Sequence, residues 1–193
     1  SQDDFGIAIA CIAQGDSNTV YLEHVEALRR PSFNGAMDYC SQLAKDWEVT
    51  RVVTDQASQQ AIVEELKKRG TKCQQVPWTG RSNSGKSKAH RYGRIKTLLM
   101  QNRLVLVDSP ELRQEFIEIT VSPSASDPGY TITTHGPDDM CDATVMAVTE
   151  AVSPKRQPPK VHDFGPSQIT IPSHQKYLSV IYGNGIPAHA IDR

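Results

Sequence analysis

Three aspartates stand close together in the segment His135–Ala143, at the start of an apolar helix pattern. Asp138 and Asp142 are four residues apart and Asp139 and Asp142 are three apart, so a helix places them on one face. Aspartates at a helix start often act as caps and complement the helix dipole. Carboxylates gathered at such a place also hold divalent metal ions, and His135 is a candidate neighbour of such a site.

A second acid, Asp55, ends the short apolar strand pattern Arg51–Thr54 and precedes a helix pattern. Open α/β sheets bind ligands at such strand ends, although an N-cap is the simpler interpretation of one isolated acid. Two separated carboxylate groups are what a two-metal phosphoryl-transfer site requires. Oxygen ligands with few histidines or cysteines favour Mg²⁺ or Mn²⁺ over zinc. We therefore predict that Asp55 and Asp139 face each other across one site that holds two such ions.

A loop and the helix pattern after it form the one clearly basic region of the chain. Its basic residues, with no acid among them, are Arg81, Lys86, Lys88, Arg91, Arg94 and Lys96. This clustering is typical of a surface that follows a phosphate backbone, although a solvated helix face has the same composition. We predict DNA contacts for Lys86, Lys88, Arg81, Arg91 and Arg94.

Part of the same loop, Gly80–Ser87, matches the phosphate-binding loop pattern G-x-x-x-x-G-K-[ST]. The preceding segment, Lys72–Trp78, is polar and contains a proline, unlike the buried central strand that such a loop requires. Asp108, the acid that could hold magnesium for a nucleotide, directly precedes the helix start Ser109-Pro110. A DNA-contact loop is therefore favoured, with a P-loop NTPase as the alternative.

The composition indicates one globular domain with an extension. The chain has 193 residues, 38% of them hydrophobic, and a formal net charge of −1. Its four cysteines lack zinc-type spacing, which indicates a reducing compartment. We find no signal peptide and no apolar run of membrane length, and therefore expect a soluble, intracellular protein without a membrane partner.

Apolar spacing predicts a hairpin over residues 5–26, followed by alternating helices and strands. The expected helices are 33–47, 56–69, 92–99, 109–119 and 140–151, and the expected strands are 50–55, 73–77 and 103–107. This order predicts an α/β fold in which a mixed sheet is covered by helices on both faces. Residues 153–193 begin with a Pro-rich, basic stretch, and we expect a linker and an irregular tail outside the domain 1–152.

Taken together, these residues resemble the C-terminal nuclease domain of viral terminase large subunits of the tailed-bacteriophage type. The motifs that carry the resemblance are Asp4-Phe5-Gly6, Val52-Val-Thr-Asp55, Lys86-Ser-Lys88 and His135-x-x-Asp138-Asp139-x-x-Asp142-Ala143. The resemblance implies a ribonuclease H-like fold and an endonuclease that cuts double-stranded DNA during virus assembly in the host cytoplasm. It implies catalytic, metal-binding roles for Asp55 and Asp139, with Asp138 and Asp142 as weaker candidate ligands.

The resemblance also implies features outside these motifs. The family's first catalytic aspartate lies on a central strand. We expect that strand upstream of Ser1, because Asp4-Phe5-Gly6 resembles the Asp-aromatic-small sequence that follows it in the family. The implied partners are an upstream ATPase domain, a portal and a small terminase subunit. A resolvase- or transposase-type nuclease and a non-catalytic DNA-binding module share the expected fold and remain as alternatives.

Overall fold

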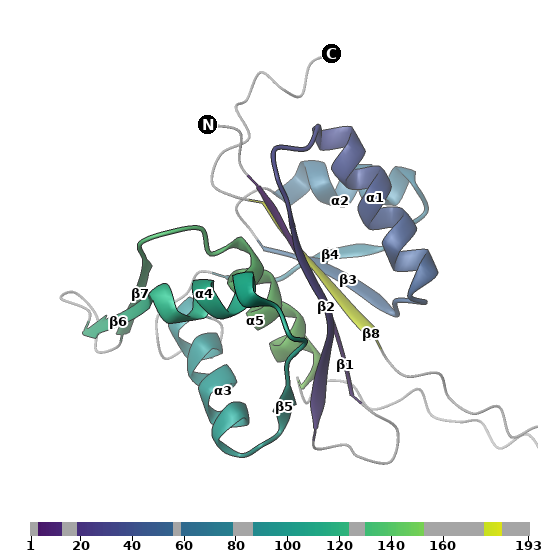
Figure 1. Ribbon diagram of the computed structural model, residues 1–193. Helices are drawn as coiled ribbons and strands as arrows, with labels where there is room; N and C mark the ends of the chain where they lie inside the picture. Colours follow the sequence, from purple (N-terminus) through teal and green to yellow (C-terminus); the bar gives the residue numbers. More distant parts are fainter. Residues whose placement is uncertain are drawn as a thin grey trace, which may run out of the picture.

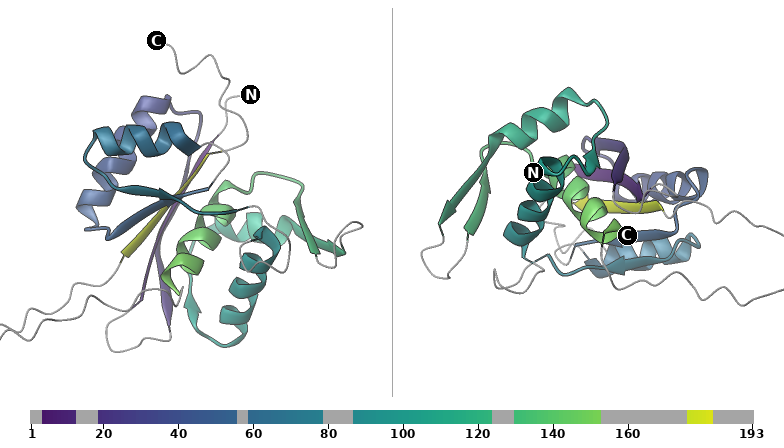
Figure 2. Two further views of the ribbon diagram at one scale, coloured as in Figure 1. Left: turned by 180° about the vertical axis from the view of Figure 1, so that it is seen from behind. Right: turned by 90° about the horizontal axis from the view of Figure 1, so that it is seen from below.

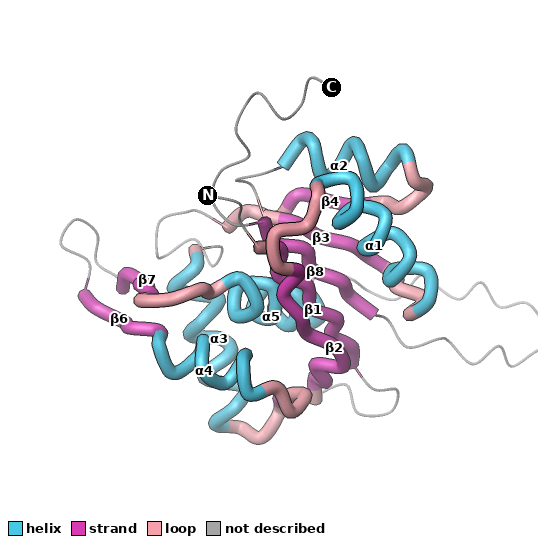
Figure 3. Tube along the Cα trace, turned by 45° about the horizontal axis from the view of Figure 1, so that its top comes forward, coloured by secondary structure: helices cyan, strands magenta, loops and turns pink. Residues whose placement is uncertain are grey.

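The computed structural model describes residues 4–12, 19–55, 59–78, 87–123, 130–152 and 176–182. They form a six-stranded sheet in the order β4-β3-β8-β1-β2-β5 and a separate two-stranded sheet, β6-β7 (Figures 1 and 3). The strands are β1 (Phe5–Ile12), β2 (Val20–Leu28), β3 (Arg51–Thr54), β4 (Cys73–Gln75), β5 (Leu104–Val105), β6 (Ile119–Pro123), β7 (Tyr130–Thr134) and β8 (Lys176–Tyr182). The helices are α1 (Phe33–Asp46), α2 (Gln59–Lys68), α3 (Lys88–Met100), α4 (Pro110–Glu118) and α5 (Asp139–Ala151).

Helices cover both faces of the large sheet, which confirms the predicted architecture. Helices α1 and α2 lie on one side, while α3, α4 and α5 lie on the other (Figures 1 and 2). The alternation of side chains along the strands separates two cores: Ile7 and Val52 belong to the α1–α2 side, whereas Ala8 and Val53 belong to the α5 side. The sheet is mixed, since β1 is antiparallel to β2 and β8, and β3 is parallel to β4 and β8.

Most of the predicted elements are present with shifted ends. The expected hairpin is β1–β2, with a bulge where the register shifts between Ile9 and Ala10. The second expected helix, 56–69, is α2, and Gly70 follows it with a φ of 80°, in the left-handed region that favours glycine. Helix α4 ends earlier than expected, because Ile119 begins β6. The β-branched run Ile-Thr-Val continues the apolar spacing of the helix, but its residue types suit a strand.

Strand β8 is the main difference from the sequence-based expectation. Residues 153–193 were expected to be an irregular tail, yet Lys176–Tyr182 forms an interior strand between β1 and β3. Its residues Tyr177, Leu178, Ser179 and Val180 are buried, as interior strands with both faces covered require. Strand β8 therefore lies between β1 and β3 and forms backbone hydrogen bonds with both. The expected strand upstream of Ser1 stays a prediction.

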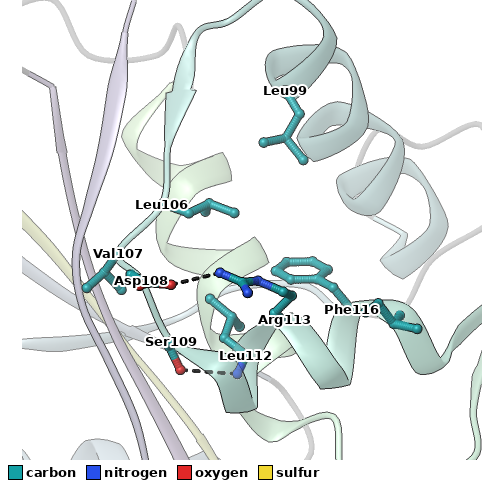
Figure 4. Close-up of a pocket in the computed structure, with 9 residues that line it drawn as sticks. Leu99, Leu106, Val107, Asp108, Ser109, Leu112, Arg113 and Phe116 are labelled. Atoms are coloured by element: carbon teal, nitrogen blue, oxygen red, sulfur yellow. Dashed lines mark hydrogen bonds and ion pairs between the residues drawn. The ribbon is translucent and has the colours of Figure 1, made fainter.

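Helices α3 and α4 meet at a largely apolar pocket of about 510 Å³ (Figure 4). Its wall includes Leu99, Leu112 and Phe116. At its rim, Asp108 is 86% exposed and forms a 2.8 Å ion pair with Arg113, so the acid considered for a nucleotide-bound magnesium lies in a surface pair. Within the described ranges, no helix combines the length and apolar character needed to cross a membrane.

Candidate active site

The N-terminus of α5 rests on the middle of the large sheet. Gly6 of β1 is the point of closest approach, because a Cβ atom built on it would lie 2.0 Å from the carbonyl oxygen of Asp139. Only a residue without a side chain permits this approach. Further along α5, the small residues Ala143 and Ala147 are fully buried. Gly6 therefore sets how close Asp139 comes to the sheet.

Asp55 follows the C-terminal end of β3, level with the start of β1 where Gly6 lies. The register pairs Thr54 with Val180 of β8, and Val180 with Ile7 of β1. One residue further along, Asp55 is therefore level with Gly6 and two strands away. At the usual spacing of neighbouring strands, this separates the two backbones by about 10 Å.

The pleat of the sheet directs Asp55 toward the face that carries α5. Val53 contributes to the core on the α5 side, and Val52 contributes to the core on the opposite side. Since side chains alternate along a strand, the second residue after Val53 points to the α5 side again. Asp55 is 5% exposed. Asp55 and Asp139 thus come from different elements to one face and one edge of the sheet.

Lys88, at the start of α3, holds the other two aspartates of the α5 motif. Its ammonium group donates to Asp138 at 2.6 Å and to Asp142 at 2.8 Å. The hydroxyl of Tyr92, one turn further along α3, donates to Asp142 at 2.6 Å. Burial lowers the pKa of Lys88, but its two carboxylate partners raise it overall. Burial raises the pKa of Asp142 to about 6, against the opposing effect of Lys88.

Asp139 faces a different set of neighbours. Burial raises its pKa to about 7, and the negative charges of Asp138, Glu115 and Asp4 add to the shift. Glu115 of α4 is 7% exposed. Burial likewise raises the pKa of Glu115 to about 7, although the Cys141 N–H, which donates to it at 2.9 Å, opposes the shift. Carboxylates that repel one another in a buried setting favour either protons or a cation.

Asp4, Glu115 and Asp139 line a pocket of about 400 Å³ between α4, the start of β1, the end of β2 and the start of α5. Its charged lining consists of Asp4, Arg29, Glu111, Glu115, Glu118 and Asp139. The sequence patterns did not single out Glu115 or Tyr92 as site residues. Glu115 stands three residues after Leu112 on the buried stripe of α4, and a charged residue in an apolar stripe is the signal that could have identified it.

Asp55 and Asp139 supply carboxylate oxygens, which are the ligands that hard divalent cations prefer. The residues level with Asp55 on β8 and β1 are Ile181 and Gly6, which offer neither a sulfur nor an imidazole ligand. In the part of the chain that the structure describes, no three acidic, histidine or cysteine side chains form a ready-made metal cluster. Asp138 and Asp142 both form ion pairs with Lys88. His135 is exposed after β7, three residues before Asp138.

The residues predicted to contact DNA do not share one environment. Arg81 and Lys86 lie outside the described residues, and Lys88 is occupied by the two aspartates. Arg94 is partly buried and donates to the carbonyl oxygen of Val152 at 3.0 Å, at the C-terminal end of α5.

Arg91 is reassigned from DNA contact to packing. It is 6% exposed, donates to Thr149 at 2.6 Å and forms a 3.2 Å ion pair with Glu150. Its guanidinium also lies 5.8 Å from the centre of the Trp78 ring. Arg91 lies on the buried face of α3 with Ile95 and Leu98. Its position on that apolar face predicts its burial better than the basic residues around it in the sequence do.

Comparison with known proteins agrees with this fold. A family model described as the terminase RNase H-like domain matches residues 1–151. The large terminase nuclease from thermophilic phage G20c is similar at 18% identity and a TM-score of 0.57, over 78% of this chain and 75% of that chain. The same nuclease with bound magnesium is similar at 16% identity and a TM-score of 0.59, over 75% and 74% of the two chains.

The Thermus phage P74-26 large terminase nuclease domain is similar at 16% identity and a TM-score of 0.53, over 76% of this chain and 78% of that chain. At these identities the likeness shows the fold, which is the expected ribonuclease H-like one. No curated protein sequence matches the chain. Because the family model covers most of its length, the chain belongs to the terminase RNase H-like domain family.

Proposed function

We propose that this chain is the metal-dependent endonuclease domain of a viral DNA-packaging terminase, and that it cuts double-stranded DNA by two-metal phosphodiester hydrolysis. The proposal depends on the positions of Asp55, at the end of β3, and Asp139, at the start of α5, which lie at the same strand ends and on the same face of the sheet. Membership of the terminase RNase H-like family supports it. The similar phage nuclease with bound magnesium supports a divalent cofactor.

In this proposal Asp55 and Asp139 hold Mg²⁺ or Mn²⁺, with two ions at the site, and Asp138 and Asp142 are weaker candidate ligands. When bound, the ions activate water and stabilise the leaving oxygen. The chain itself holds Asp139 close to the sheet through Gly6 and keeps Asp138 and Asp142 in place through Lys88.

The proposed macromolecular substrate is double-stranded DNA, approached by the loop that precedes α3. Lys86, Arg81 and Arg94 are the proposed phosphate contacts, since lysine and arginine neutralise phosphates without reading the sequence. Lys88, which the sequence also suggested as a DNA contact, instead pairs with Asp138 and Asp142. The further proposed partners are an ATPase domain, a portal and a small terminase subunit, and the proposed setting is virus assembly in the host cytoplasm; membership of a terminase family supports both.

The test is cleavage of supercoiled plasmid DNA by the purified full-length protein with Mg²⁺ or Mn²⁺. We expect cleavage that chelator abolishes and that Asp139→Asn and Asp55→Asn each reduce to background, with the fold verified by circular dichroism. Asp108→Asn is the matched control, because Asp108 is an exposed aspartate whose ion pair lies at the surface. Cleavage that persists in excess chelator would refute the metal-dependent mechanism.

A non-catalytic DNA-binding module is the second candidate. It is favoured by the lack of a ready-made three-residue metal cluster among the described residues. This candidate requires salt-dependent DNA binding with no cleavage in either metal. An NTPase is less favoured, because β4, the strand before the Gly80–Ser87 loop, is a three-residue edge strand of the sheet as described. Saturable ATP binding in calorimetry would reverse that preference.

A further inference from the structure

Helix α5 begins without a side-chain cap of its own. Asp138 occupies the N-cap position but makes no capping hydrogen bond, because its carboxylate receives Lys88. Helices α1, α3 and α4 are instead capped locally by Ser32, Ser87 and Ser109. The first N–H groups of any helix need partners from outside its own hydrogen-bond ladder. Those of α5 must therefore find a partner elsewhere.

Glu115 of α4 supplies that partner from 26 residues away in the sequence. Its Oε2 accepts a hydrogen bond from the backbone N–H of Cys141, the third residue of α5, at 2.9 Å. Glu115 is 7% exposed, and Leu112, one turn earlier on α4, is 2% exposed. A carboxylate at this place also meets the positive end of the α5 dipole. The contact thus replaces a local cap with one that ties two helices together.

The same contact limits the position of Asp139. Its carbonyl oxygen lies against Gly6 on the sheet side, and the backbone two residues later is held by Glu115 on the α4 side. Between these two contacts, the first turn of α5 cannot slide along the sheet or tilt away from it without breaking one of them.

We propose that Glu115 is a positioning residue for the metal-binding acid Asp139, acting as a cap on α5 and not as a ligand itself. This inference rests on the proposed metal-dependent function. Groups that orient the ligands of a metal site typically change metal affinity by about 10- to 100-fold when removed. The expected loss is therefore measurable by direct binding.

Two substitutions separate a cap from a ligand. Glu115→Gln keeps an oxygen that accepts from the Cys141 N–H but removes the negative charge. Glu115→Ala removes both, and Glu115→Met is the substitute if the alanine variant does not fold. Glu64→Ala is the matched control, since Glu64 is an exposed glutamate within α2, on the other face of the sheet and outside the pocket lining.

The experiment measures two quantities on the full chain: the hydrogen-exchange rate of the Cys141 amide in chelator, and the dissociation constant for Mn²⁺ by calorimetry. For Glu115→Ala we expect at least about tenfold faster exchange and about tenfold weaker Mn²⁺ binding. Glu115→Gln and Glu64→Ala should stay within about threefold of the wild type in both. The Gly35 amide, capped by Ser32, should be unchanged throughout.

Two results would overturn the inference. If Glu115→Gln weakens Mn²⁺ binding as strongly as Glu115→Ala while the Cys141 amide stays protected, the charge is what matters and Glu115 is a ligand. If Glu115→Ala speeds exchange but leaves Mn²⁺ binding unchanged, the cap does not position Asp139. Absence of Mn²⁺ binding by the wild type would count against the proposed function itself, while the exchange rates would still report the cap.

Discussion

Gly6→Ala is the substitution that most directly tests whether the contact between β1 and α5 places Asp139. The added Cβ would lie 2.0 Å from the carbonyl oxygen of Asp139 and 2.3 Å from its carbonyl carbon. Both are backbone atoms, so no side chain can rotate out of the way. To reach ordinary van der Waals contact, the start of α5 must retreat by about 1.4 Å, and overpacking of this kind typically costs about 1–3 kcal/mol.

The effect on activity should exceed the effect on stability. A displacement of about 1 Å at a reacting group can reduce the rate by roughly 100-fold. We expect Gly6→Ala to lower the free energy of unfolding in urea by about 2 kcal/mol and to reduce Mn²⁺-dependent plasmid cleavage by about 100-fold. Mn²⁺ affinity, measured by calorimetry, should fall as well, because one ligand has moved away from the other.

Gly93→Ala is the matched control for this experiment. Gly93 lies within α3, and a Cβ built on it meets nothing within 4 Å. Glycine inside a helix is unfavourable by about 0.5–1 kcal/mol relative to alanine, so this variant should be slightly more stable and equally active. If Gly6→Ala matched the wild type in unfolding, Mn²⁺ binding and cleavage, the proposed role of the contact would be wrong.

Three further predictions follow from the charges and the topology. Lys88→Met removes the ion pair with Asp142 and should lower the free energy of unfolding by about 2 kcal/mol, measured in urea; an unchanged midpoint would contradict it. Asp139 and Glu115 each have a folded-state pKa of about 7, above ordinary values of 3.8 and 4.5. The folded state therefore binds more protons, and stability in chelator should fall as pH rises from about 4 to 7, which urea midpoints across that range would detect. Deletion of the residues from 153 onward removes β8 (Lys176–Tyr182) and should abolish the cooperative unfolding transition seen by circular dichroism, because β1 and β3 lose their shared partner; a retained transition would show that 1–152 folds alone.

Local patterns predicted the elements whose own residues specify them. Helix α1 was expected from the spacing of Phe33, Met37 and Cys40, and the structure places Met37 and Cys40 in the core. The β1–β2 hairpin was expected from two apolar runs around a turn cluster. In both cases the apolar period and the flanking turn residues agree, which is when sequence patterns are most informative.

Elements that depend on distant partners were not predictable in this way. The run Tyr177–Tyr182 is short and isolated among glycines, prolines and histidines, and only its pairing with β1 and β3 makes it an interior strand. Arg91 lies in a basic stretch, but its partner Glu150 is 59 residues away. The capping role of Glu115 likewise depends on Cys141, which lies on another helix. Local charge describes composition, whereas burial and partners are set by the tertiary fold.

The distribution of charge at the start of α5 explains how a buried helix can carry three adjacent acids. Lys88 compensates Asp138 and Asp142 on the α3 side, while burial and the negative charges of Asp138, Glu115 and Asp4 raise the pKa of Asp139. Gly6 lets the backbone of Asp139 lie close to the sheet, level in register with Asp55 at the end of β3. A cation bound there would relieve a repulsion that the folded chain already contains. The free energy of that relief would strengthen cation binding without any change of fold, because Asp55 and Asp139, the proposed ligands, lie on elements that the folded sheet already places.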